Sequence, residues 1–228
     1  MPISFCEIYN QNLAIKDDPV LGKLSPPDFY QLSWRYLLYA ISYFYKDDTV
    51  DTNETLPRVG QYTPYSCNNF SYTGDGMDDT FVLTSPAIIN GLFYVEVLVD
   101  GIKDDITYQY VEATNSIVIS PTPPLYADIN ISNYQIGEFT GAIPLNQMEI
   151  TILSEGMNIP YLEQAQATRD ILEMAVYSGT FKEHSRAEHL QRVSAVVDSQ
   201  RKYVDLLIME YSYKYNMENY MGLRGNFS

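Results

Sequence analysis

The strongest constraint on this chain is a long helical pattern near its C-terminus. The segment from His184 to Gly222 contains no proline and no internal glycine. Packable residues recur there at alternating steps of three and four, the spacing of one face of a packed helix. They are Leu190, Val193, Val197, Gln200, Val204, Leu207 and Tyr211. The pattern predicts a helix of roughly 38 residues, or about 55 Å, which is longer than a domain of this size covers with its own core.

The end of this predicted helix is rich in tyrosine and methionine, and an irregular tail follows from Gly222 to Ser228. Apolar extensions beyond a core usually meet a partner surface, so residues 209–228 are predicted to form a partner-binding arm. The alternative is a helix that folds back on its neighbours. The candidate contact residues are Met209, Tyr211, Tyr213, Tyr215, Met217, Tyr220, Met221, Leu223 and Phe227.

Composition excludes several classes of protein. The 228 residues carry a formal net charge of −15, so the chain lacks the basic surface that DNA or RNA binding requires. No signal peptide is expected, because the N-terminus lacks a basic region followed by an apolar run. No membrane-spanning segment is expected, because no apolar run is long enough. Cys6 and Cys67 have no metal-ligand or disulfide spacing. The 21 tyrosines favour interfaces and half-buried sheets, although codon bias of an AT-rich genome is an alternative explanation.

The order of helical and β patterns predicts an α+β fold. Residues 1–24 read as irregular, and Ser25 caps a helix that runs from Phe29 to Lys46. Helices return after Pro144, at Leu145–Glu155, which Gly156 ends, and at Tyr161–Ser178, which Pro160 opens. We predict a discontinuous helical bundle (1–68 and 140–208), an inserted antiparallel β-sandwich (69–139) and the C-terminal arm (209–228).

The inserted segment carries β-branched and aromatic residues in short, regularly spaced runs, which is typical of a small antiparallel sandwich. Asp100 and Gly101 begin a turn, and the charged run after them predicts a loop longer than a two-residue hairpin. The predicted strands are Thr80–Leu83, Phe93–Asp100, Ile106–Val111, Ile117–Ser120 and Ala127–Tyr134.

No motif for catalysis or cofactor binding is present. His184 and His189 are five positions apart, one more than the inverted zinc-peptidase pattern allows, so a solvated helix start is expected. Asp75, Asp78 and Asp79 lack the spacing of an EF-hand loop, and a turn is favoured, with a loose calcium site left open. We therefore expect no enzyme, no cofactor and no metal.

Several motifs of the inserted segment resemble a β module common in virion proteins of tailed phages. They are a Gly-Asp-Gly start and a Thr-Phe-Val-Leu strand in Tyr72–Leu83, then Tyr94–Ile102, Ile106–Tyr110, Ser116–Ser120 and Pro121–Pro124. Asp100 stands where that module more often has asparagine. The helical part is similar in layout to head-to-tail adaptor proteins of short-tailed phages, including the first ring below the portal in crAss-like phages.

The resemblance implies a virion protein, assembled in the host cytoplasm, that forms a cyclic homo-oligomer, a dodecamer in that family. Its partners would be the portal, reached by the C-terminal arm, and the next tail or ring protein. DNA would pass an acidic bore without specific binding. A phage fibre or decoration protein that binds glycans or another virion protein is the alternative. If the protein lines a DNA passage, its arginines are expected to contact neighbouring proteins rather than line the bore. They are Arg35, Arg58, Arg169, Arg186, Arg192, Arg201 and Arg224.

Overall fold

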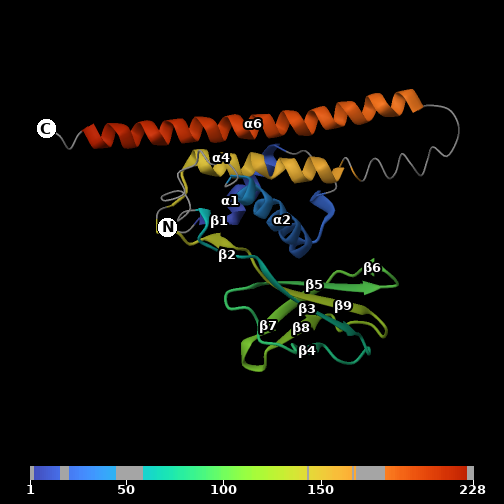
Figure 1. Cartoon of the computed structure of the whole chain (residues 1–228). Coiled ribbons are helices and arrows are strands. Elements are labelled where there is room, and N and C mark those ends of the chain that lie inside the picture. The colour runs from blue at the N-terminus through green and yellow to red at the C-terminus, as the bar shows by residue number, and fades with distance from the viewer. Residues whose placement is uncertain are drawn as a thin grey trace. The chain divides into compact units, whose positions relative to one another are not determined.

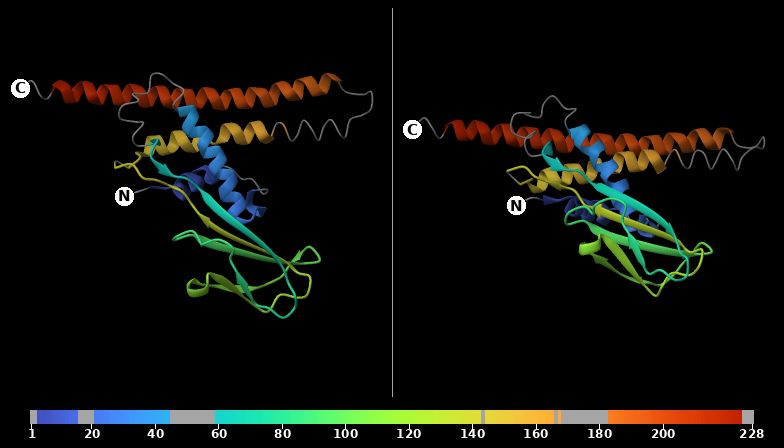
Figure 2. Two further views of the ribbon diagram at one scale, coloured as in Figure 1. Left: turned by 60° about the horizontal axis from the view of Figure 1, so that its bottom comes forward. Right: turned by 90° about the horizontal axis from the view of Figure 1, so that it is seen from below.

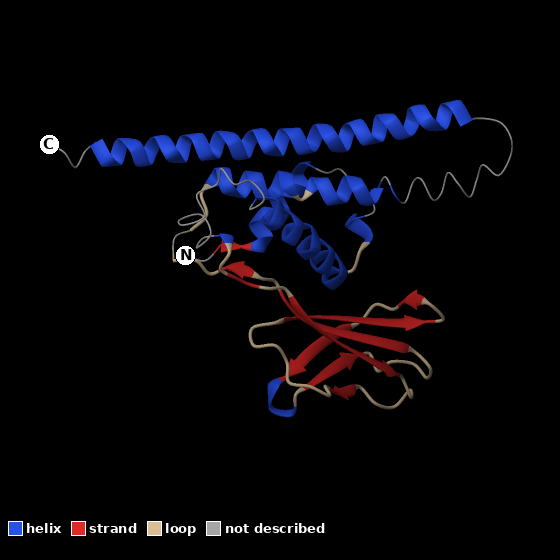
Figure 3. Ribbon diagram, viewed as in Figure 1, coloured by secondary structure: helices blue, strands red, loops and turns tan. Residues whose placement is uncertain are grey.

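The computed structural model describes residues 3–15, 21–44, 59–142, 144–165, 167 and 183–224. It contains helices and antiparallel sheets, so the predicted α+β class is confirmed (Figure 3). The chain divides into two compact units. The first unit takes its described residues from Met1–Pro19, Leu32–Thr63 and Glu138–Ser228, and the second from Val20–Gln31 and Pro64–Gly137.

Residues 3–15 form regular secondary structure, so the prediction of an irregular start was wrong for them. A short strand, β1 (Ile3–Ser4), leads into helix α1 (Phe5–Ile15), and a 3-10 turn, η1, spans Leu21–Lys23. Helix α1 buries Phe5, Ile8 and Tyr9. It also buries Asn12, whose amide donates to the Ser154 carbonyl at 2.7 Å and to Asn158 Oδ1 at 2.9 Å. A polar residue on the inner face therefore hid the helical pattern.

Helix α2 (Pro26–Phe44) begins as the sequence predicts. The Ser25 hydroxyl accepts a hydrogen bond from the Asp28 backbone N–H at 3.4 Å and donates one to the Asp28 carboxylate. The predicted end at Lys46 lies outside the described residues. From Leu32 onward the helix belongs to the first unit, where Leu37 and Phe44 are buried.

Helix α4 (Gln147–Gly156) starts with a complete capping box, in which Asn146 and Glu149 each bind the other's backbone N–H. Gly156 ends this helix, but Met157 after it is right-handed (φ −65°), so no left-handed cap forms. The glycine serves close packing instead, because a Cβ there would lie 3.0 Å from Ala40 Cβ. Residues 158–165 are helical again, so Pro160 lies inside that stretch rather than opening it, and residues 168–182 lie outside the description.

Helix α6 (Glu183–Arg224) confirms the predicted long C-terminal helix. Helix α4 packs against both α1 and α6 and runs alongside α6 (Figures 1 and 2). Val197, Val204 and Tyr211 of the predicted seam are buried. A small antiparallel sheet, in which β10 (Glu138–Phe139) lies between β1 and β2 (Tyr62–Thr63), completes this unit.

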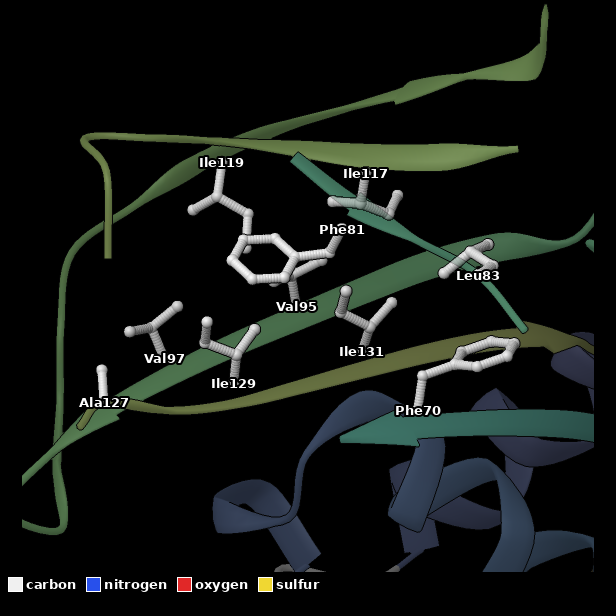
Figure 4. Packing of buried hydrophobic residues seen from close by; sticks show 10 residues of the cluster. All are labelled: Phe70, Phe81, Leu83, Val95, Val97, Ile117, Ile119, Ala127, Ile129 and Ile131. Atoms are coloured by element: carbon white, nitrogen blue, oxygen red, sulfur yellow. The ribbon is translucent and has the colours of Figure 1, made fainter. Parts of the chain in front are cut away.

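The second unit contains two antiparallel sheets. One has the order β3-β9-β5-β6 and the other the order β4-β8-β7. Their buried side chains form one hydrophobic cluster, which includes Phe70, Phe81, Val97, Ile117 and Ile129 (Figure 4). The strands are β3 (Ser66–Thr73), β4 (Thr80–Val82), β5 (Leu92–Val99), β6 (Ile102–Lys103), β7 (Thr107–Val111), β8 (Ser116–Ser120) and β9 (Asp128–Gln135).

The five predicted strands are present within one or two residues, with two corrections. Strand β3 begins at Ser66, three residues before the predicted start of the β segment. Asp100 and Gly101 form a two-residue turn, because Val99 pairs directly with Ile102. Both turn residues have positive φ, 52° and 78°, as a type I′ hairpin turn requires. The charged run that suggested a longer loop begins in β6 and continues beyond it.

Candidate interaction surface

One face of helix α6 packs against the other elements of the first unit. Val197, Val204, Ile208 and Tyr211 are at most 5% exposed. Gln200 donates from Nε2 to the Glu155 carbonyl at 3.1 Å and to its Oε2 at 2.9 Å. These contacts set the rotation of the helix about its own axis and decide which residues remain outside.

The opposite face of α6 presents large apolar side chains to solvent. Their exposed fractions are 52% for Val196, 45% for Tyr203, 52% for Leu206, 61% for Met209 and 70% for Tyr213. At 100° per residue this group lies on the side away from Val204 and Ile208. A run of this kind on one helix is larger than the scattered apolar side chains of an ordinary surface. We define these five residues as the outer face of α6.

The outer face includes part of the predicted partner-binding arm and excludes one residue of it. Met209 and Tyr213 are exposed, whereas Tyr211 is 4% exposed and its hydroxyl donates to Glu149 Oε1 at 2.7 Å. Tyr211 therefore belongs to the core of the first unit and is not free to contact a partner. The side chains of Tyr215, Met217, Tyr220, Met221, Leu223 and Phe227 lie outside the described residues.

Helix α6 differs in charge from the rest of the chain. It carries six basic and six acidic residues, a formal net charge of zero. The remaining 186 residues carry eight basic and 23 acidic residues, so the whole charge of −15 lies outside α6. Asp198, Lys202, Glu210 and Lys214 are exposed on this helix in mixed order. The net negative charge that makes two copies of this chain repel each other is therefore absent from α6.

Of the arginines considered above, Arg201 is engaged within the first unit. Its guanidinium forms an ion pair with Glu163 and lies 3.7 Å from an Asp198 carboxylate oxygen. The carboxylate of Glu163 is the main cause that raises the Arg201 pKa. Arg35 is exposed. The side chains of Arg58, Arg169, Arg186, Arg192 and Arg224 lie outside the described residues.

The candidate chemical groups have structural roles where they are described. Asp75 Oδ1 accepts hydrogen bonds from the backbone N–H groups of Met77 and Asp78, both at 2.8 Å, and these bonds lower its pKa. Within the described residues, no group of three His, Cys, Asp or Glu side chains is placed to hold a metal ion. Cys67 is a free thiol whose pKa is raised, chiefly by burial. The side chains of His184 and His189 lie outside the described residues.

Sequence reasoning identified Met209 and Tyr213 but missed Val196, Tyr203 and Leu206. The signal was present, because Val196 and Tyr203, like Leu206 and Tyr213, are seven positions apart. That second periodicity is masked by the buried seam, which uses similar spacing on the other face. None of the helices that the structure describes has both the length and the apolar character of a membrane span.

Comparisons of the chain with protein-family models, with curated proteins and with solved structures found no significant match.

Proposed function

We propose that the chain is a structural virion protein that forms a ring in the neck of a tailed phage, where it joins the portal to the tail. The observation that carries this proposal is the C-terminal end of α6. The helix passes the start of α4 (Figures 1 and 2), where the Tyr211 hydroxyl donates to Glu149 in the first turn of α4 at 2.7 Å. Residues 213–224 continue as helix beyond that contact, starting with an exposed tyrosine. A helical extension of this kind suits docking on a larger partner.

In this proposal the first unit acts as a discontinuous helical bundle that builds the ring, and the second unit is an inserted β-sandwich module. The two sheets that share one hydrophobic cluster support the sandwich assignment. The module reaches the next tail or ring protein. The 23 acidic residues outside α6 support a bore that repels DNA, so that DNA passes without specific binding. Ring closure, with twelve copies by resemblance, requires heterologous contacts between neighbours.

A fibre or decoration protein that binds glycans is the second candidate. Tyr126 favours it, because its side chain is 79% exposed and its backbone is held at φ 64° by a hydrogen bond from its N–H to the Gly74 carbonyl at 2.8 Å. An exposed aromatic ring on a backbone held in this way offers a large apolar face to a ligand. If the wild-type protein binds a glycan on an array and Tyr126→Ala does not, this candidate is supported over the ring.

The test of the ring proposal is a truncation that spares the core. Deleting Met209–Ser228 removes the buried Tyr211 and is expected to destabilise the first unit. Deleting Tyr215–Ser228 leaves Tyr211 in place and should give a folded protein. Each protein is coexpressed with the portal protein of the same phage genome, and the mass of the complex is measured.

The full chain should form a ring on the portal, and the deletion of Tyr215–Ser228 should abolish it. A helical circular dichroism signal close to that of the full chain is the control for folding. If the full chain stays separate from the portal, or if the shorter protein binds it equally well, the proposal is wrong.

A further inference from the structure

Four of the five residues of the outer face of α6 follow a heptad spacing, and the fifth, Met209, lies at a flanking g position. Val196 and Tyr203 are seven residues apart, Leu206 and Tyr213 are seven residues apart, and Tyr203 precedes Leu206 by three. These are the a and d positions of a coiled coil, with Ser199 and Glu210 filling the two remaining places. A repeat of about 3.5 residues keeps a seam facing one neighbouring helix, whereas a helix on a broad sheet presents a wider stripe. We therefore expect the partner that covers this face to be a helix.

The charge of the chain indicates which helix fits. The residues outside α6 include 23 acidic and only eight basic ones. Two copies therefore repel each other wherever these acidic surfaces meet. Helix α6 is neutral and offers both signs on its exposed side, with Asp198 and Glu210 next to Lys202 and Lys214. Two copies can therefore meet on this long helix without net repulsion, and mixed charges beside an apolar seam suit a partner with the same pattern.

We propose that the outer face of α6 pairs with the same face of a second copy of this chain, with the two helices antiparallel. The direction follows from Glu210. In a parallel pair in register, Glu210 meets Glu210 of the second copy inside the seam, and like charges there are unfavourable. In the antiparallel pair, a positions meet d positions: Tyr203 meets Leu206 of the second copy, and Val196 meets Tyr213. Glu210 then faces the Ser199 hydroxyl, which donates a hydrogen bond to a carboxylate.

The size of the outer face suits a reversible dimer. Two tyrosines and three aliphatic side chains, each about half exposed or more, present roughly 500 Å² per helix, judged against about 150–250 Å² for a whole aromatic side chain. A pair then buries about 1,000 Å² in total, at the lower end of specific interfaces. The dimer forms without being permanent.

This pairing is distinct from the proposed ring and does not depend on it. It is isologous and closes at two copies, while a ring needs heterologous contacts. Pairing covers Met209 and Tyr213, which lie where the proposed portal-docking segment begins. The dimer is thus a form of the free protein in which this apolar face is kept from water until another partner replaces the second copy.

The first test measures the mass of the purified full chain by sedimentation velocity, without portal, from about 1 μM to about 1 mM, a range that detects weak association. The wild-type chain should pass from monomer to dimer. Leu206→Glu, which places a good helix former at the centre of the seam, should raise the dissociation constant at least tenfold. Ile102→Glu, at a site 72% exposed in β6, adds the same charge away from α6 and should leave the dimer unchanged.

The second test fixes the direction. Chains carrying Tyr203→Cys and chains carrying Leu206→Cys are oxidised separately and as a mixture, with the wild-type chain and its two native thiols as background. The mixture should give a crosslinked pair of the two variants, and neither variant alone should crosslink beyond wild type. Self-crosslinking of each variant with no gain in the mixture overturns the antiparallel arrangement.

Three mass results overturn the pairing: a monomer at the highest concentration, a dimer that Leu206→Glu leaves intact, or an assembly larger than two. None of them requires the portal protein. A failed dimer therefore leaves the ring proposal standing, and a failed portal complex leaves the dimer standing.

Discussion

Removing a single hydroxyl from α6 tests how this helix is held to the first unit. Tyr211→Phe keeps the aromatic ring against Phe44, where the ring centroids are 5.6 Å apart. It deletes the donor that binds Glu149 Oε1 at 2.7 Å. Both residues are buried, at 4% and 0% exposed, so water does not replace the lost hydrogen bond without rearrangement.

The expected loss is about 2 kcal/mol in the free energy of unfolding. Hydrogen bonds to charged groups contribute about 1.5–3 kcal/mol, and Tyr211→Phe removes one such bond from a buried site. The other oxygen of Glu149 still accepts from the Asn146 backbone N–H at 2.7 Å, which keeps the loss below the upper end. The change in volume is one oxygen atom, so a cavity contributes little.

Urea unfolding followed by helical circular dichroism measures this loss. For a slope of about 1–3 kcal/mol per molar urea, the midpoint should fall by about 1 M. Tyr213→Phe makes the same chemical change two residues later, at a side chain that is 70% exposed, and should stay within about 0.5 kcal/mol of wild type. Equal effects at the two positions would refute the assignment of Tyr211 to the core.

The sequence was sufficient for elements whose own pattern is strong. Helix α6 follows from a run without proline or internal glycine, and the burial of Val197 and Val204 follows from the seam. Strands β5 and β9 follow from alternation and β-branched density, because both pack one face on the cluster of the second unit.

The errors arise where long-range partners satisfy polar residues. Asn12 looks like a surface residue of a loop, yet Ser154 and Asn158, more than 140 positions away, accept its hydrogen bonds and allow its burial. Tyr211 is similar, since Glu149 lies 62 positions away. Local periodicity placed Tyr211 on the packed seam of the helix but identified neither distant partner. Helix α1 was therefore missed, and Tyr211 was also counted among the contact residues of the partner-binding arm.

Two further substitutions and a pH series test local details. Gly74→Ala should destabilise the second unit by about 2–3 kcal/mol, because its Cβ would lie 2.3 Å from the Pro124 carbonyl oxygen. At Gly101→Ala the added Cβ meets no atom within 4 Å, so the free energy of unfolding should fall by only about 1 kcal/mol, because of the φ of +78° alone. Urea unfolding measures the effect of both substitutions. The Tyr43 hydroxyl donates to Asp205 Oδ1 at 2.8 Å, and burial first, then this bond, raises the Tyr43 pKa above its ordinary value near 10. A raised tyrosine pKa means that the folded state keeps a proton which the unfolded state releases above about pH 10, so this contribution to stability is complete below that pH and declines above it. Tyr43→Phe has neither the bond nor the proton, so the difference in urea midpoint between the two proteins should be largest near pH 8 and should shrink above about pH 10. A difference that stays constant across this range would show that burial and Asp205 do not hold the Tyr43 proton.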